Sequence, residues 1–134
     1  MITVSGSLGR WRVISVSGNL DFPATPVLRG LFADLVDSGH SHLLVDLGGI
    51  GFIDSSGLGV LIEAQCRVQG LGGELRVVAS RPAIAALFRV TGLSAAIAVY
   101  QTMTDAELDV LEDDSEPRPA GTASRTGASW ASLG

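Results

Sequence analysis

Hydrophobic and polar positions along the chain change their spacing in a regular way. Residues 2–5 and 11–17 are rich in β-branched and other apolar side chains, and the glycine-containing run 6–9 between them predicts a β-hairpin. From 27 to 36, apolar residues recur every three or four positions, which predicts a helix with one buried face. A proline just before this segment can occupy the first turn of the helix. The chain is therefore expected to begin with two strands and a helix.

The same alternation continues as far as residue 111. Short apolar runs predict strands, and three- or four-residue spacing predicts helices; the strands are expected at 43–47, 74–78 and 96–100, and the helices at 56–68, 82–90 and 105–111. Strands that alternate with helices form parallel sheets, so we expect an α/β fold. Its mixed, mostly parallel sheet would have about five strands, an antiparallel N-terminal hairpin and about four packed α-helices.

Charge is unevenly distributed along the 134 residues. Residues 1–104 hold seven arginines and seven acidic side chains, whereas 105–134 hold seven acidic side chains and two arginines, which accounts for the whole formal charge of −5. A mean hydropathy of +0.38 with 17% charged residues excludes wholesale disorder. A neutral core with an acidic end offers no basic surface for nucleic acid or anionic lipid, so neither is an expected partner.

The last part of the chain lacks apolar periodicity. Fifteen of the residues in 115–134 are Ala, Gly, Ser, Thr or Pro, a composition that buries too little surface to offset the entropy of ordering. We expect one domain at 1–112 and a flexible tail at 113–134, acidic at first and then rich in small residues. Trp130 in this tail is either an exposed aromatic side chain or a docking anchor. No apolar run is long enough to cross a membrane, and the N-terminus lacks the features of a signal peptide, so a cytoplasmic protein is predicted.

The strongest chemical signal is the run 52–59, Phe-Ile-Asp-Ser-Ser-Gly-Leu-Gly, between a predicted buried strand and a predicted helix. One or two of Asp54, Ser55 and Ser56 should cap the helix N-terminus. Two adjacent serines exceed what a cap requires, and the two glycines leave room for another surface to approach. A hydroxyl there lies where the helix dipole favours negative charge by about 0.3–1 kcal/mol. From the residues alone, capping, anion binding and phosphorylation all stay open.

This run, preceded by Leu-Leu-Val-Asp-Leu at 43–47, resembles the signature of the STAS domain of bacterial anti-sigma factor antagonists. Three further segments resemble the family in the expected order: the turn 18–21, where Asn19 replaces the usual glutamate, the turn 70–75, and the third helix with its Gly-Leu exit at 82–93. The resemblance covers about residues 2–112, nearly the whole predicted domain.

The resemblance implies a binding module that is not an enzyme. The unphosphorylated domain would bind a serine kinase of the histidine-kinase-like ATPase fold and thereby release a sigma factor. Phosphorylation of the second serine, Ser56 (alternatively Ser55), would end this binding, and a PP2C-type phosphatase would restore it. The resemblance places partner binding at Asp21, Asp54, Ser55, Gly57, Leu58 and Gly59, in a monomer or weak dimer without a cofactor. The alternative is a STAS-like sensing or scaffold domain that binds a nucleotide or other anion at the Ser56 end of the helix.

Other chemistries receive little support. A serine with His40 or His42, both predicted in a polar loop, could suggest a hydrolase, but the pattern Gly-x-Ser-x-Gly is absent. The chain contains no lysine, which excludes a P-loop. Cys66, the only cysteine, is predicted to face the core, and one cysteine cannot form an internal disulfide or a multi-cysteine metal site. Asp46 is predicted to end a strand and cap a turn. We therefore predict no catalytic residue and no metal site.

Overall fold

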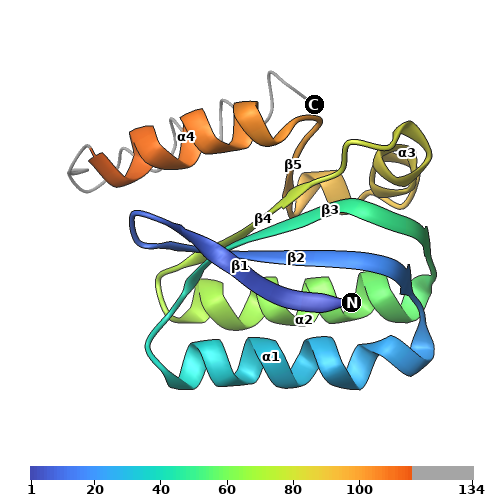
Figure 1. The fold of residues 1–134 in the computed structure, drawn as a ribbon, viewed down its shortest axis with the longest axis horizontal. Coiled ribbons are helices and arrows are strands. Elements are labelled where there is room, and N and C mark those ends of the chain that lie inside the picture. Colours follow the sequence, from blue (N-terminus) through green and yellow to red (C-terminus); the bar gives the residue numbers. More distant parts are fainter. Residues whose placement is uncertain (116–134) are drawn as a thin grey trace.

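The computed structural model describes residues 1–115, with side chains described to residue 112 (Figure 1). The elements follow the predicted order: β1 (Ile2–Leu8), β2 (Trp11–Leu20), the 3-10 turn η1 (Phe22–Ala24), α1 (Thr25–Asp37), β3 (His42–Ile53), α2 (Ser55–Gly70), β4 (Glu74–Val78), α3 (Pro82–Val90), the 3-10 turn η2 (Leu93–Ala95), β5 (Ala98–Tyr100) and α4 (Met103–Ser115). None of the described helices is long and apolar enough to cross a membrane. The tail predicted at 113–134 lies almost wholly outside the described residues.

The five strands form one sheet in the order β1-β2-β3-β4-β5. β1 pairs antiparallel with β2 through a hairpin, and every other neighbouring pair is parallel. Parallel neighbours need a crossover, which α1, α2 and α3 provide. The predicted α/β class, with a mixed sheet of five strands and four α-helices, is confirmed.

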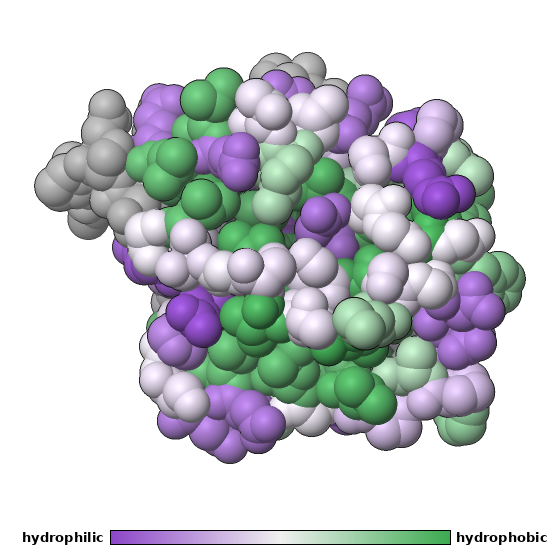
Figure 2. All heavy atoms as spheres, viewed as in Figure 1, coloured by the Kyte–Doolittle hydropathy of each residue, from purple (hydrophilic) through white to green (hydrophobic). Residues whose placement is uncertain are grey.

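Helices cover both faces of this sheet. α1 and α2 pack on one face, and α4 lies across the other (Figure 1). Side chains of β2 point to both faces of the sheet. Ile14 and Val16 pack in the larger core with α1 and α2. Trp11 and Val13 pack in the smaller core under α4. At the open edge of β1 the larger core reaches the surface, where Figure 2 shows apolar side chains between β1 and α1.

Three strands extend further than the sequence predicts. β2 continues to Leu20, through residues 18–20 that the sequence predicts as part of a turn. The turn of the hairpin lies at Gly9 and Arg10, and not at 6–9, because Gly6 stays in β1 at a break in the register. β3 continues to Ile53 because Gly48 and Gly49 sit within the strand beside another register shift against β2. A Cβ atom on Gly49 would lie 2.9 Å from the Ser17 Cβ atom, so a larger residue would force the two strands apart.

Three individual predictions are corrected. Asp46 does not end its strand: it lies inside β3, where its Oδ1 atom accepts a hydrogen bond from the Gly48 N–H at 2.8 Å and stabilises the irregular segment. Cys66 is exposed, and Gln65 takes the core position beside it. The last helix begins at Met103 and continues to Ser115, so it is longer than the predicted 105–111.

Gln65 is a buried polar side chain of α2 that bonds to two backbone segments. Its Oε1 atom accepts a hydrogen bond from the Leu75 N–H at 2.7 Å, and its Nε2 atom donates to the Ala96 carbonyl at 2.8 Å. Buried amide groups require such partners. Helix α2 is therefore tied to the start of β4 and to the segment before β5.

A second buried polar group holds α4 to the sheet. The Arg76 guanidinium of β4, only 1% exposed, lies 4.5 Å from the centre of the Trp11 ring and 2.8 Å from Glu74. It also lies 3.6 Å from Asp109 of α4 and donates to the Tyr100 hydroxyl, which in turn donates to Asp109. Burial, aided by Asp109, raises the pKa of Tyr100 far above its usual value, although Arg76 acts in the opposite direction.

Candidate functional site

The candidate site is the N-terminus of α2, where the chain leaves the carboxyl end of β3. Asp54 is the N-cap residue in extended conformation, and its Oδ1 atom accepts hydrogen bonds from the N–H groups of Ser56 at 2.9 Å and Gly57 at 3.1 Å. The Asp54 N–H in turn donates to the Leu20 carbonyl at the end of β2. Asp54 alone therefore provides the side-chain cap and ties the start of α2 to two strands.

The two serines follow this cap within the helix. Ser55, which the resemblance would make a neighbouring cap, is instead the first residue of α2 and is exposed; Ser56 is half-buried. Because the carboxylate of Asp54 caps the helix, neither hydroxyl is required for that purpose. The capping interpretation therefore accounts for Asp54 but leaves both serines unexplained.

The two glycines of the motif differ in what they contact. Gly57 is buried, and a Cβ atom there would lie 2.5 Å from the Leu20 carbonyl oxygen and 3.0 Å from a carbon of Ile53. A Cβ atom on Gly59 would meet nothing within 4 Å. Gly57 thus allows α2 to pack closely on the sheet. Gly59 adds no side chain to the surface one helical turn from the serines.

The remaining predicted partner-binding residues divide by exposure. Leu58 is only 9% exposed and belongs to the larger core, so it positions the helix from inside. Asp21 is half-buried and directly follows Leu20, which pairs with Ile53 in the parallel register. The ends of β2 and β3 therefore bring Asp21 and Asp54, which come from different strands, to the same edge of the sheet.

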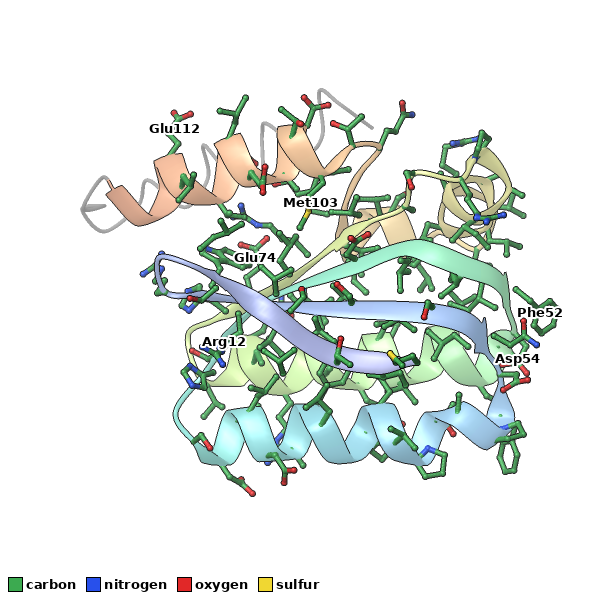
Figure 3. All side chains as sticks on the ribbon, viewed as in Figure 1. Arg12, Phe52, Asp54, Glu74, Met103 and Glu112 are labelled. Carbon is green, nitrogen blue, oxygen red and sulfur yellow. The ribbon has the colours of Figure 1, made fainter. Side chains whose placement is uncertain are left out.

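Sequence reasoning missed a set of exposed apolar side chains around this edge. Phe22 is 73% exposed in the turn after Asp21, Phe52 is 50% exposed two residues before Asp54, and Val27 is 61% exposed in the first turns of α1. Figure 3 shows Phe52 and Asp54 at the same end of the sheet. The sequence signal of Phe22 and Phe52 is weak, because each is an apolar residue next to a turn. Val27 is a correction: the periodicity of 27–36 predicts it on the buried face of the helix, but it is exposed in the structure.

The histidines do not belong to this site. His42 starts β3, at the opposite end of the strand that leads to Asp54, and its ring packs edge-on against Trp11 with centroids 5.2 Å apart. At ~3.3 Å per residue the length of β3 separates His42 from the serines by far more than hydrogen-bond reach. Among the described residues, no group of three or more His, Cys, Asp and Glu side chains could hold a metal ion. What the site offers chemically is a pair of hydroxyls at a helix N-terminus beside two carboxylates.

Comparison with known proteins relates the chain to a family. The family model described as "Mlab, STAS domain" matches residues 6–105. The anti-sigma F factor antagonist of Paenibacillus polymyxa is 28% identical over 102 residues, covering 74% of this chain and 87% of the relative. The anti-sigma-B factor antagonist of Bacillus subtilis is 31% identical over 80 residues, covering 60% of this chain and 72% of the relative.

Solved structures agree with these matches. The crystal structure of an anti-sigma factor antagonist from Mycobacterium paratuberculosis superposes with a TM-score of 0.73 at 28% identity, covering 84% of this chain and 93% of that one. The family match therefore extends from sequence to fold. The chain belongs to the STAS domain family and is a distant homologue of the bacterial anti-sigma factor antagonists.

Proposed function

We propose that this protein is an anti-sigma factor antagonist that acts by partner switching, with Ser56 as the phosphorylated residue and Ser55 as the alternative. The unphosphorylated form would bind an anti-sigma factor serine kinase of the histidine-kinase-like ATPase fold in the cytoplasm and free its sigma factor for transcription. A PP2C-type phosphatase would reverse the modification. The protein is a substrate and a switch in this scheme, and it catalyses nothing itself.

One observation carries the proposal: Asp54 caps α2, so two hydroxyls stand at the helix start without being needed to form it. The open surface at Gly59 and the exposed Phe22 and Phe52 around it support a partner interface there. Exposed aromatic side chains are typical of the residues that dominate binding energy. Of the residues assigned to partner binding by resemblance, we place Asp21, Ser55 and Gly59 in contact with the partner, whereas Asp54, Gly57 and Leu58 hold them in position.

The charge of a phosphoryl group is sufficient for switching. Phosphorylation adds about −1.5 to −2 charges at pH 7. In the free protein, water and the helix dipole stabilise the added charge. In an interface the same charge is desolvated close to the carboxylates of Asp21 and Asp54, and like-charge contacts cost several kcal/mol. A loss of ~4 kcal/mol lowers affinity roughly a thousandfold, so no refolding of the domain is required.

The alternative function, binding of a nucleotide or another anion at this helix end, is disfavoured by the same cap. The N–H groups of Ser56 and Gly57 already donate to a carboxylate, and that carboxylate would repel a free anion. A covalent phosphoryl group does not need those donors. The presence of both serines also favours the phosphorylation scheme, since only that scheme needs a hydroxyl group as acceptor.

The test is phosphopeptide mapping of the protein recovered from its native cells in different growth and stress conditions. Cleavage after Arg29 and Arg67 places both serines in one peptide, and fragmentation then distinguishes Ser55 from Ser56. We expect phosphate on Ser56 whose occupancy changes with condition, and its loss in Ser56→Ala but not in the matched exposed-site variant Ser38→Ala. Complete coverage of this peptide without modification in any condition would contradict the proposal.

A further inference from the structure

The outer side of β1 is an edge of the sheet (Figure 1). β1 is the first strand in the sheet order, and among residues 1–115 no other strand pairs with this side. The opposite edge differs, because β5 has only three residues and the chain leaves it directly into α4. Exposed strand edges attract other chains unless short length, charge, proline or a bulge protects them. Of the two edges, β1 is therefore the longer one open to pairing.

The outward-pointing backbone groups at the start of β1 belong to Ile2 and Val4. The Ser17 N–H donates to the Met1 carbonyl at 2.8 Å, so Met1 and Ser17 form a hydrogen-bonded pair next to the β1–β2 ladder. The register is regular from Ile2 to Val4, and an antiparallel ladder alternates hydrogen-bonded with non-hydrogen-bonded pairs. The N–H and C=O groups of Ile2 and Val4 therefore point away from β2.

This stretch of β1 carries none of the usual features that protect an edge. Residues 1–9 include no charged side chain and no proline. The register breaks only between Val4 and Gly6, beyond the two residues whose backbone points outward. The break therefore limits how far a new strand could pair, but it leaves the first five residues available.

An apolar surface lies beside this edge, between β1 and α1 (Figure 2). Ile2 and Val4 are half-buried at the rim of the larger core, as is Leu31 of α1. Val27, one helical turn before Leu31, is 61% exposed. Both α1 residues lie two positions from Arg29, which pairs with Glu63 of α2, so they lie on nearly the opposite side of the helix. The flank of α1 that faces away from α2 is thus apolar.

We propose that β1 pairs with β1 of a second copy of this chain, in an antiparallel, two-fold symmetric dimer centred on Thr3. In this register Ile2 of each copy lies opposite Val4 of the other. Each of these two pairs exchanges two hydrogen bonds, so the four outward groups of one chain meet the four of the second. A shift of the register by two residues would leave only one such pair.

The edge is self-complementary in charge as well as in hydrogen bonding. Neither copy brings a charged side chain from residues 1–9, so the two edges do not repel each other. The symmetry axis is perpendicular to the sheet, which places α1 of both copies on the same face. Ile2 and Val4 of the second copy then extend the apolar surface beside α1. Isologous contacts of this kind close a dimer and leave no free edge for further growth.

The seam is short, and it includes no residue of the α2 site. We therefore expect a reversible dimer that forms as the concentration rises, and the proposal does not depend on the phosphorylation scheme. Sedimentation velocity of the full chain, reduced and without an added N-terminal tag, measures this association. The average mass should increase from the 13.8 kDa of one chain toward twice that value and no further.

A matched pair of variants tests the backbone contacts. Ile2→Pro removes an outward N–H that β2 does not use, whereas Ile2→Ala shortens the same side chain and keeps this N–H. Because two of the four intermolecular bonds lose their donor, Ile2→Pro should have a dissociation constant roughly tenfold higher than Ile2→Ala. Thermal unfolding of both variants checks that the domain stays folded.

Cross-linking tests the register. Thr3 faces its own copy in a non-hydrogen-bonded pair, where Cα atoms are about 4.5 Å apart, a distance that a disulfide spans. Ser5, equally exposed, is offset from its own copy by four residues, or about 13 Å. In a glutathione buffer, Cys66→Ser/Thr3→Cys should therefore give roughly tenfold more covalent dimer than Cys66→Ser/Ser5→Cys.

Four outcomes would each overturn the proposal. The first is a mass that stays at 13.8 kDa at every concentration. The second is growth beyond a dimer, which would indicate a head-to-tail contact. The third is equal association of the proline and alanine variants at position 2. The fourth is equal cross-linking at positions 3 and 5, which would place any dimer contact outside this register.

Discussion

The Asp54 carboxylate accepts a hydrogen bond of 2.9 Å from the backbone N–H of Ser56, the residue whose hydroxyl we propose is phosphorylated. The cap and the modified group are thus two parts of one helix turn. The backbone of Ser56 belongs to the structural cap, and its side chain is left for chemistry. Variants at this turn can therefore separate stability from regulation.

Replacing the capping carboxylate should weaken the fold by a moderate amount. We expect Asp54→Ala to lower the free energy of unfolding by about 1 kcal/mol, within a range of about 0.5–2, because two N–H groups lose their acceptor. Asp54→Asn, which retains an acceptor oxygen, should lose less. Urea unfolding measures both, and the exposed Asp34→Ala in α1 serves as the control with a change within about 0.5 kcal/mol. Equal effects of the alanine changes at 54 and 34 would contradict the capping role.

The two glycines of the motif should respond to alanine in opposite directions. Gly57→Ala places a Cβ atom 2.5 Å from a backbone oxygen, so we expect a destabilisation of about 1–3 kcal/mol from overpacking. Gly59→Ala enters open space in a helix and should stabilise the domain by about 0.5–1 kcal/mol. Thermal unfolding of both variants tests this. A change in stability of the same sign in both variants would show that Gly57 and Gly59 are not packed as described.

The buried arginine should be one of the most sensitive charged positions. Arg76→Ala leaves Glu74 and Asp109 without their cation and removes the contact with Trp11, so we expect a loss of about 3 kcal/mol. Both carboxylates retain some access to water, which places this value at the low end for a broken buried pair. Denaturant titration with the exposed Arg89→Ala as the control makes the measurement, and a change within about 0.5 kcal/mol in both variants would refute it.

Stability should decrease in alkaline solution through Tyr100. Its pKa in the folded state is raised, chiefly by burial, so the unfolded chain loses the phenolic proton first, near pH 10. Below that pH the contribution of Tyr100 to the free energy of unfolding is fully present, and this contribution is lost progressively as the pH rises further. Tyr100 is the only tyrosine, so ultraviolet titration of the native and unfolded chain reports on this group alone. Tyr100→Phe should unfold with a weaker dependence on pH above 10, and an ordinary native titration would contradict the expectation.

The sequence predicted the presence and type of the helices and strands better than the residues at which they begin and end. Periodicity identified all five strands and four helices, but β3 was truncated because Gly48 and Gly49 look like a loop. Only the neighbouring strand reveals that small residues are needed there for close approach. Likewise, the number of residues per turn could not decide whether Gln65 or Cys66 faces the core. Gln65 faces the core because its side-chain amide forms hydrogen bonds with two backbone groups in distant segments.

At the site, too, features formed by residues adjacent in the chain were predicted, whereas features formed by tertiary packing were missed. The Asp-Ser-Ser-Gly motif located the helix start because its residues are adjacent in the chain. Phe22 was missed, since its proximity to Asp54 arises from the pairing of β2 with β3. Phe52 is close to Asp54 in the chain, but its exposure was missed because it lies at the end of a strand predicted to be buried. Arg76 was missed because an arginine between apolar strand residues normally faces solvent, and only the placement of α4 encloses it.

The double hydrogen bond of Gln65 has a mechanical consequence for the serine-bearing helix. Any sliding of α2 along its axis would break the contacts to Leu75 and Ala96 and leave the buried Leu75 N–H without its acceptor. The helix is therefore anchored in its middle while its first turn meets solvent. A binding partner would encounter the same scaffold before and after modification, and it would have to distinguish the two forms by the chemical group alone.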